Sequence, residues 1–390
     1  MRILQVCDYY QYLGGTETYI INLSRDLEAQ GHSISVMYAI KTDKTFFSDN
    51  RGEHYFAAIM VDEKLSLNQE KEIREIIDKE NPDIIYIHNV FNSYLIDKLS
   101  KMRPVVRFIH DHNIFCPKGD KFLDLKGKVC PCACGISCFF NAYINRCLPR
   151  NPFKTIRLIR QKRRQAGINK KINIIVASNY MKGCLIQNGF WSAKIKVISY
   201  YTTPIKYDQV FFKDFLLFVG RVHKTKGLQI LLPALAKSSS NIKLVVIGEG
   251  RYMDEAKSLA SKLKLKNRVS FLGQLSQEKI VEYFVDCFAL VISSRWPEPF
   301  GIVGIEAMSY KKPVIASDVG GICDWLDDNT NGFLVDNSDA EKLAEKIKFL
   351  YYNKDKAKDM GQEGYKIFQD KFSKDTHINN LIGFFNELKQ

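Results

Sequence analysis

The sequence lacks any apolar run close to the roughly 20 residues that a membrane-spanning helix needs. Its first apolar stretch, residues 1–7, turns polar at Asp8, which indicates a short strand rather than a signal peptide. We therefore expect a cytoplasmic chain. With 390 residues, of which 46% are hydrophobic and 26% charged, it is predicted to be globular, with two domains.

Acidic residues are absent from a long internal stretch. No Asp or Glu lies between Asp124 and Asp208, whereas this stretch contains sixteen Lys and Arg residues. Because the net charge of the whole chain is +14, the remainder is slightly acidic. A surface of one sign attracts a polyanion, which here means a nucleic acid, an anionic membrane or a phosphorylated substrate.

Two common nucleotide motifs are also missing. The glycine-rich turn at Gly14 and Gly15 is neither the Gly-x-Gly-x-x-Gly fingerprint nor a P-loop, which argues against a dehydrogenase or an NTPase. Glycines still allow the backbone to approach a phosphate, and we expect Thr16 to cap the following helix. A glycine-rich turn without a ligand remains an equal alternative for this segment alone.

Apolar strands alternate with helical stretches along both halves of the chain. The predicted strands are 3–7, 33–39, 84–88, 105–110, 174–177, 215–219, 243–247, 269–272, 289–292 and 314–316. The predicted helices include 16–30, 72–80, 153–170, 253–265 and 277–284. This order predicts two doubly wound α/β domains, joined by a linker at 200–214 and facing a central cleft that holds the ligand.

The most informative segment runs from Ser293 to Glu306. Pro297 and Pro299 forbid a helix before Phe300, so a helix is expected to begin at Phe300-Gly301 with free amides for a phosphate or a sugar hydroxyl. Glu298 precedes that helix and can accept bonds from sugar hydroxyls. Glu306 lies inside the helix, where it can reach a ribose.

A second segment, residues 220–227, follows the predicted strand 215–219. Arg221 and Lys226 leave the end of this strand and can neutralise a diphosphate leaving group. A solvated basic turn is the alternative. A third feature is His110, at the end of the strand 105–110, where it is well placed for a substrate hydroxyl. His112 close by could instead be a metal ligand.

Together these segments resemble the retaining glycosyltransferases of family four, which have the GT-B fold of two Rossmann-like domains. The resemblance is strongest over 215–336 and includes Gly248 in Val-Ile-Gly-Glu-Gly and Gly273 in Phe-Leu-Gly. It implies a metal-independent reaction without a catalytic cofactor. The domains that the resemblance implies are an N-terminal acceptor-side domain, 1–205, and a domain for the nucleotide sugar, 206–370. A C-terminal helix, 371–390, is expected to cross back to the N-terminal domain.

The resemblance also assigns site residues. The residues implied in catalysis are His110 by the donor sugar, Arg221 and Lys226 on the diphosphate, and Glu298 on the sugar. The donor, expected to be a UDP- or GDP-sugar, would contact Gly14, Gly15, Gly248, Gly273, Leu275, Phe300, Gly301, Ile302 and Glu306.

Six of the ten cysteines lie within the segment 116–147, a Cys-rich loop also seen in a subset of family four. In a cytosolic chain this clustering favours metal binding over disulfides. We predict a structural zinc or iron–sulfur cluster on Cys116, Cys130, Cys138 and Cys147, with Cys134 as a substitute. Thiols without a metal, or disulfides, remain the alternative.

The basic helix 153–170 interleaves Lys and Arg with apolar residues, a pattern compatible with an anionic membrane surface. We therefore predict a retaining hexosyltransferase on the inner face of the membrane, which transfers a hexose or hexosamine to a glycan or lipid-linked acceptor of a cell-surface polysaccharide. A sugar-nucleotide epimerase of the same fold is the nearest rival. A nucleic-acid-binding protein is a weaker one, and no nucleic-acid partner is expected, because the basic stretch lacks interleaved aromatic residues for stacking.

Overall fold

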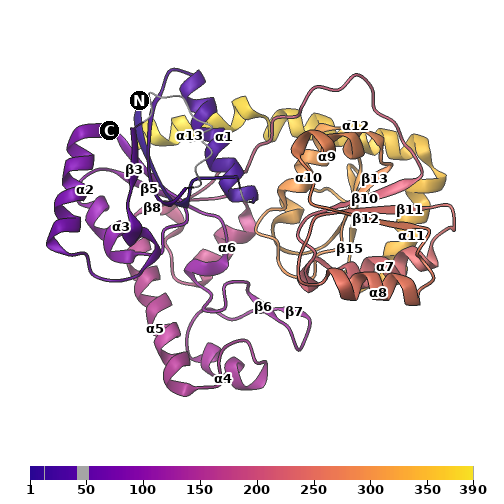
Figure 1. Ribbon diagram of the computed structural model, residues 1–390, viewed down its shortest axis with the longest axis horizontal. Coiled ribbons are helices and arrows are strands. Elements are labelled where there is room, and N and C mark those ends of the chain that lie inside the picture. The colour runs from indigo at the N-terminus through magenta and orange to yellow at the C-terminus, as the bar shows by residue number, and fades with distance from the viewer. Residues whose placement is uncertain (13, 42–51, 390) are drawn as a thin grey trace. The chain divides into compact units, whose positions relative to one another are not determined.

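The computed structural model describes residues 1–12, 14–41 and 52–389, which fall into two compact units. Unit 1 comprises Met1–Leu125, Pro131–Ile198 and Ile378–Gln390, and unit 2 comprises Lys126–Cys130 and Ser199–His377. Figure 1 labels the elements of both units along the chain.

Unit 1 is built on a seven-stranded sheet of order β3-β2-β1-β4-β5-β8-β9, in which all strand pairs are parallel. The strands are β1 (Arg2–Tyr9), β2 (Ser33–Ile40), β3 (Gly52–Tyr55), β4 (Ile84–Ile87), β5 (Val105–Ile109), β8 (Asn173–Val176) and β9 (Ile195–Val197). The central strands β4 and β5 are buried at every residue, as expected when helices cover both faces of a parallel sheet.

The helices of unit 1 are α1 (Gly15–Ala29), α2 (Leu67–Glu80), α3 (Ser93–Ser100), α4 (Ile136–Ile144), α5 (Pro152–Asn169), α6 (Asn179–Gln187) and most of α13 (Lys374–Glu387). Short 3-10 turns lie at Ala57–Met60, His112–Ile114 and Ser192–Lys194. Local signals explain where the basic helix α5 starts. Asn151 accepts a bond from the Lys154 amide as its N-cap, and Pro152 occupies the first turn, where its missing N–H costs nothing.

Unit 2 repeats the same construction. Its parallel sheet has the order β12-β11-β10-β13-β14-β15. The strands are β10 (Phe215–Val219), β11 (Lys243–Ile247), β12 (Val269–Gly273), β13 (Ala289–Ile292), β14 (Val314–Ser317) and β15 (Gly332–Val335). The helices are α7 (Leu228–Lys237), α8 (Met253–Lys262), α9 (Gln277–Asp286), α10 (Ile302–Ser309), α11 (Ala340–Tyr352) and α12 (Lys354–Lys371), with 3-10 turns at Lys224–Lys226 and Gly320–Asp324.

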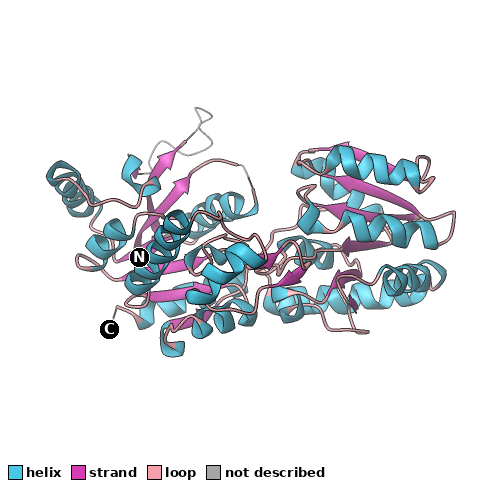
Figure 2. Ribbon diagram, turned by 90° about the horizontal axis from the view of Figure 1, so that it is seen from below, coloured by secondary structure: helices cyan, strands magenta, loops and turns pink. Residues whose placement is uncertain are grey.

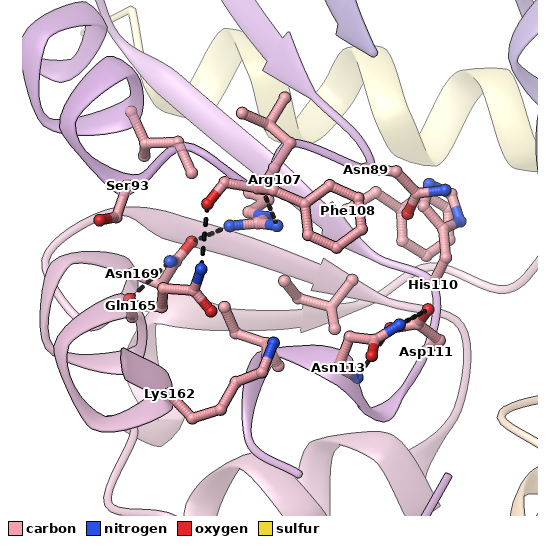
Figure 3. A pocket seen from close by; sticks show the side chains of 15 residues that line it. Asn89, Ser93, Arg107, Phe108, His110, Asp111, Asn113, Lys162, Gln165 and Asn169 are labelled. Atoms are coloured by element: carbon pink, nitrogen blue, oxygen red, sulfur yellow. Dashed lines mark hydrogen bonds between the residues drawn. The ribbon is translucent and has the colours of Figure 1, made fainter. Parts of the chain in front are cut away.

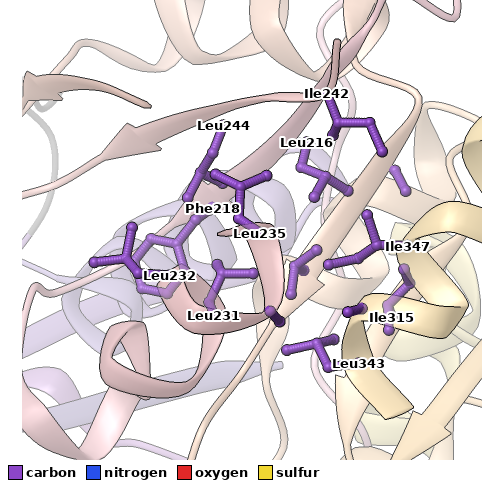
Figure 4. Close-up of a cluster of buried hydrophobic side chains, with 14 of the residues drawn as sticks. Leu216, Phe218, Leu231, Leu232, Leu235, Ile242, Leu244, Ile315, Leu343 and Ile347 are labelled. Carbon is purple, nitrogen blue, oxygen red and sulfur yellow. The ribbon is translucent and has the colours of Figure 1, made fainter. Parts of the chain in front are cut away.

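The hydrophobic core of unit 2 lies between its sheet and the helices α7, α8 and α11. Leu216 and Leu244 from the strands meet Leu231 of α7 and Ile347 of α11, and all four are fully buried (Figure 4). Figure 2 shows the strands in magenta with cyan helices beside them. The predicted fold class, α/β with two doubly wound parallel sheets, is confirmed.

Some elements differ from the prediction. The segment 116–147, predicted as a loop, contains the small ribbon β6 (Phe122–Leu123) and β7 (Lys128–Val129) and the helix α4. The prediction that Thr16 caps its helix is wrong. The helix α1 begins at Gly15, Gly14 is its N-cap, and no side chain bonds to the first amides.

Candidate active site

The sheet of unit 2 has a topological switch point at β10, which is hydrogen-bonded to β11 on one side and to β13 on the other. In open parallel sheets, ligands bind outside the carboxyl ends of the strands at such a point. The loop after β10 carries Arg221 and Lys226, and the loop after β13 carries Glu298. The chain therefore places these predicted residues at the two loops that border the switch point.

Lys226 and Glu298 form an ion pair. The Lys226 ammonium donates to Oε1 of Glu298 at 2.6 Å, and the Ser294 hydroxyl donates to the same oxygen. Glu298 is only 5% exposed, so its charge needs these partners. The Lys226 ammonium also lies 5.4 Å from the centre of the Trp296 ring. Among the described residues, no hydrogen bond is made to Oε2 of Glu298, which is therefore available to a ligand hydroxyl.

Close backbone packing holds this pair in place. Gly227, next to Lys226, has φ 81°, and a Cβ there would lie 1.6 Å from the Ser293 carbonyl oxygen. A Cβ on Gly320, with φ 65°, would lie 2.2 Å from the carbonyl oxygen of Glu298. Gly321 donates its amide to that same oxygen at 2.7 Å. Side chains are excluded at these glycines because the loops touch backbone to backbone.

The helix α10 starts directly after Glu298, at the predicted place. Gly301 is its N-cap in the left-handed region at φ 90°, and no side chain caps the first amides. The Trp325 indole donates to the Phe300 carbonyl at 2.7 Å and fixes the approach to the helix. The uncapped amides from Ile302 onward can therefore bind a negatively charged oxygen.

Glu306 lies on α10 and differs from Glu298 in its surroundings. Burial raises the pKa of its carboxyl group to about 7. Within the described ranges, no hydrogen bond or ion pair to this carboxylate is found. A half-buried carboxylate without a partner is suited to accept bonds from ligand hydroxyls.

Two further loops, after β11 and after β12, lie at the same edge of unit 2. Gly248, after β11, donates its amide to the Gly273 carbonyl at the end of β12 at 2.7 Å. A Cβ on Gly248 would lie 2.1 Å from the Gly220 carbonyl oxygen, so this position also requires glycine. Arg221 is exposed, and Leu275 is half-buried just after β12. Among the residues that the structure describes, Arg221 makes no hydrogen bond or ion pair to the Lys226–Glu298 pair.

Unit 1 also has a switch point, at β1, which pairs with β2 and β4. Gly14 and Gly15 follow β1 at the start of α1. His110 follows β5, and its Nε2 lies 3.0 Å from Nδ1 of His88, which follows β4. Burial lowers the pKa of His88 to about 3 and that of His110 well below its usual value, so both rings are neutral at pH 7.

His88 lies next to the predicted site residue His110, and the sequence analysis did not single it out. It was the last, polar residue of the predicted strand 84–88, and this was its only signal. That signal becomes informative once the strand order places β4 beside β5. His112, the other histidine considered, is fully buried and packs on Phe115 and Tyr180.

The predicted metal site is not supported. In the described part of the chain, no three His, Cys, Asp or Glu side chains are grouped so that they could hold a metal ion. A hydrogen bond from Cys134 lowers the pKa of the Cys138 thiol to about 6, and Cys138 and Cys147 also lie against the cluster of Leu148 and Ile159, whereas Cys116 packs in another cluster. The predicted set of Cys116, Cys130, Cys138 and Cys147 is therefore not found as a metal site among the described residues.

The structure separates the residues of the basic helix α5 by direction. Arg164, which pairs with Asp62 at 2.5 Å, lies in an outer groove with Arg157 and Arg160, together with Phe153 and Ile156. Lys162 instead lines a different pocket, beside Arg107 and Asp111. In the residues that the structure describes, no helix is both long enough and apolar enough to span a membrane.

Two family models match the chain. Residues 13–200 match Glycosyltransferase Family 4, and residues 210–367 match Glycosyl transferases group 1. An uncharacterized glycosyltransferase of Methanocaldococcus jannaschii is 26% identical over 100% of this chain and 99% of its own length. An O-antigen chain mannosyltransferase C of Escherichia coli is 28% identical, but the match covers 45% of this chain and 47% of that protein.

Solved structures agree with the fold. The HepE protein of Anabaena, solved in complex with UDP, superposes with a TM-score of 0.73 over 99% of this chain and 100% of that one, at 20% identity. A glycosyltransferase from Rickettsia africae gives a TM-score of 0.74 over 99% and 98%, at 21% identity. The GT-B fold is confirmed, whereas membership of the cysteine-rich subset stays a prediction.

Proposed function

Because the chain belongs to the glycosyltransferases that its two matching family models describe, we propose that it transfers a hexose or hexosamine from a nucleotide-diphosphate sugar. The acceptor is a glycan or a lipid-linked sugar of a cell-surface polysaccharide, and the anomeric configuration is retained. The observation that carries this proposal is the ion pair between half-buried Lys226 and buried Glu298 at the switch point of unit 2.

Each residue of this edge has a role in the proposed reaction. Lys226 and Arg221 neutralise the charge that develops on the departing diphosphate, together with the uncapped amides of α10. Glu298 is held through Oε1, so its Oε2 orients the hydroxyls of the donor sugar. Glu306 accepts bonds from the ribose hydroxyls. The acceptor hydroxyl attacks the anomeric carbon on the face from which the diphosphate leaves.

For unit 1 we keep the prediction that Gly14, Gly15 and His110 contact the donor. His110 is neutral, because burial lowers its pKa, and it can therefore donate to or accept from a sugar hydroxyl without carrying charge. A UDP-sugar is the first donor to test, because HepE of Anabaena was solved with UDP and with UDP-glucose. A GDP-sugar is the second.

We also propose that unit 1 touches an anionic membrane surface through α4 and the N-terminal half of α5. Ile136, Phe140 and Ile144 recur along one face of α4 and are 79%, 56% and 66% exposed. Phe153 of α5 is 83% exposed beside Arg157 and Arg160. Figure 1 shows α4 beside one end of α5, away from the sheet of unit 1. Exposed aromatic and aliphatic groups next to arginines suit the interface of an anionic bilayer.

The test is a panel of UDP- and GDP-sugars in thermal unfolding, followed by turnover measurements with the donor that binds. A donor present at 100 times its Kd should stabilise the protein by about 2.7 kcal/mol. The Lys226→Ala variant should lose most of that shift. A panel without any stabilising nucleotide sugar contradicts the proposal, and donor isomerisation in the absence of acceptor would identify an epimerase instead.

A further inference from the structure

Unit 1 contains a polar pocket next to His110 that the donor roles above do not use (Figure 3). It lies between the loop after β4, the carboxyl end of β5 and the inner face of α5. Its cavity volume is about 30 Å³, which is room for about two water molecules or one phosphate or carboxylate group, and too small for a sugar ring.

Arg107 is a buried cation in this pocket. It is 9% exposed, and burial lowers the pKa of its guanidinium to about 10, so it stays charged at pH 7. Nη1 donates to the Asn169 side chain at 2.7 Å and Nη2 to the Val90 carbonyl at 2.9 Å, and both of these acceptors are neutral. Nε is buried and has no hydrogen-bond partner in the described structure. Asp111 and Asp8 interact with this guanidinium electrostatically but not through a hydrogen bond. A buried cation that is not hydrogen-bonded to a carboxylate is costly, so the site favours an anion.

Lys162 supplies a second positive charge. It reaches from α5 toward the centre of the pocket, as Figure 3 shows, and burial lowers the pKa of its ammonium group. No hydrogen bond or ion pair of this ammonium is found within 1–12, 14–41 and 52–389. Lys162 therefore faces the same small space as Arg107 without a protein acceptor.

One carboxylate, that of Asp111, lines the described part of this pocket. It accepts from the amide and the side chain of Asn113 at 2.8 and 2.6 Å. Asp8 also acts electrostatically on Arg107, and Asp62 on Lys162, but Asp62 is paired with Arg164 and neither carboxylate lines the pocket. No carboxylate is therefore hydrogen-bonded to the two cations of the pocket among the described residues. The neutral ring of His110 forms part of the same wall.

We infer that this pocket is an anion subsite, in which Arg107 and Lys162 hold a phosphate or a carboxylate of the acceptor. This step rests on the proposed transfer of a sugar to an acceptor, and it narrows the acceptor to an anionic one. Because His110 lines the pocket, an anion bound there keeps the acceptor beside the imidazole that the donor sugar is expected to meet. The anion is either the phosphate of a lipid-linked acceptor or the carboxylate of an acidic sugar.

The experiment uses the full chain and three probes: inorganic phosphate, glucuronate and UDP. The Lys226→Ala variant serves as the background, so that phosphate bound at the diphosphate site of unit 2 does not contribute. In this background, phosphate or glucuronate should still raise the unfolding temperature. Adding Lys162→Gln should weaken that binding at least about tenfold, whereas Lys182→Gln on α6, the same loss of charge elsewhere in unit 1, should leave it unchanged.

The two anions separate the two sources. Binding of phosphate alone indicates a phosphorylated acceptor, and binding of glucuronate alone indicates an acidic sugar. Arg107→Gln should abolish binding of either one. If circular dichroism shows that Arg107→Gln does not fold, the difference in anion binding between Lys162→Gln and Lys182→Gln tests the subsite by itself.

UDP distinguishes failure of this inference from failure of the proposed function. UDP should stabilise the single variant Lys162→Gln as well as wild type. If UDP binds but Lys162→Gln weakens the binding of neither phosphate nor glucuronate, the anion subsite is wrong and the glycosyltransferase proposal stands. If Lys162→Gln weakens anion binding but no nucleotide or nucleotide sugar binds, the anion subsite stands and the proposed function fails.

Discussion

The carboxyl edges of the two sheets carry their charges in opposite ways. In unit 2, Lys226 is bonded to Glu298 at 2.6 Å, within loops that touch backbone to backbone. In unit 1, Arg107 bonds only neutral acceptors, and no partner of Lys162 is found in the described residues. The unit 2 edge is positioned before a ligand arrives, as catalysis of a charged leaving group requires, whereas the proposed anion subsite of unit 1 has cations that are not hydrogen-bonded to a carboxylate among the described residues.

The largest effect should come from breaking the pair of unit 2. Lys226→Ala should reduce kcat for donor turnover about 10³-fold, and Glu298→Gln about 10²-fold. The double variant should lose little more than Lys226→Ala, because the two side chains act as a unit. Steady-state kinetics on all three test this, with Lys224→Ala in the same turn as a control that stays within about twofold. Additive losses would show that the pair is not one functional group.

The second prediction concerns the backbone packing that holds this edge. Gly227→Ala should destabilise the protein by about 3 kcal/mol, because its Cβ would overlap the Ser293 carbonyl and its φ of 81° disfavours alanine. The matched control is Gly167→Ala in α5 of unit 1, where nothing lies within 4 Å of the added carbon, and a gain of about 0.5–1 kcal/mol is expected. Urea unfolding measures both. Equal stability of the two variants would show that the loops of unit 2 are not rigidly packed.

The third prediction uses the raised pKa of Glu306, which is about 7 when folded against a usual 4.5. The folded state then holds a proton that the unfolded state releases, so this group costs stability as the pH rises from 4.5 to 7. Glu306→Gln should therefore stabilise the ligand-free protein by about 2 kcal/mol at pH 8 and by little at pH 4.5. The same change should weaken UDP binding about tenfold.

Urea unfolding at the two pH values, together with UDP titration, checks this prediction. Glu345→Gln on α11 is the control, because Glu345 is 71% exposed and its loss should alter neither quantity. If Glu306→Gln raises the stability equally at both pH values, the gain does not come from removing the ionised carboxylate of Glu306.

The smallest predicted effect is on vesicle binding, and it distinguishes Arg160 in the outer groove of α5 from Lys162 in the pocket beside Arg107. Arg160→Gln should weaken binding to vesicles that contain phosphatidylserine by about fivefold, since each basic residue near an anionic surface contributes about 1 kcal/mol. Lys162→Gln should not change vesicle binding, because Lys162 lines the internal pocket. Vesicle co-sedimentation measures this, with Arg74→Gln on α2 as the control. If Arg74→Gln weakens vesicle binding as much as Arg160→Gln does, the effect comes from the net charge of the protein, and the proposed membrane surface is wrong.

Strands buried on both faces could be predicted from sequence because each is a short apolar run bounded by turns. The predicted strands at 215–219, 243–247 and 289–292 agree with β10, β11 and β13 to the residue. The strands β3, β9 and β15 were missed. Glu53 in β3 and Lys196 in β9 interrupt the apolar run, and β15 begins at Gly332, a residue that usually marks a turn. The helix α4 was missed because cysteine, proline and glycine around it indicate a loop.

The local sequence by itself determined where the loops that carry Lys226 and Glu298 lie and where the helix that carries Glu306 begins, because glycine and proline restrict the backbone at those positions. Only the tertiary structure decided what each charge meets. The partner of Glu298 is 72 residues away along the chain, and Arg107 meets Asn169 across 62 residues. Whether a charge is paired depends on which strands the fold places side by side, and a local pattern of residues does not contain that information.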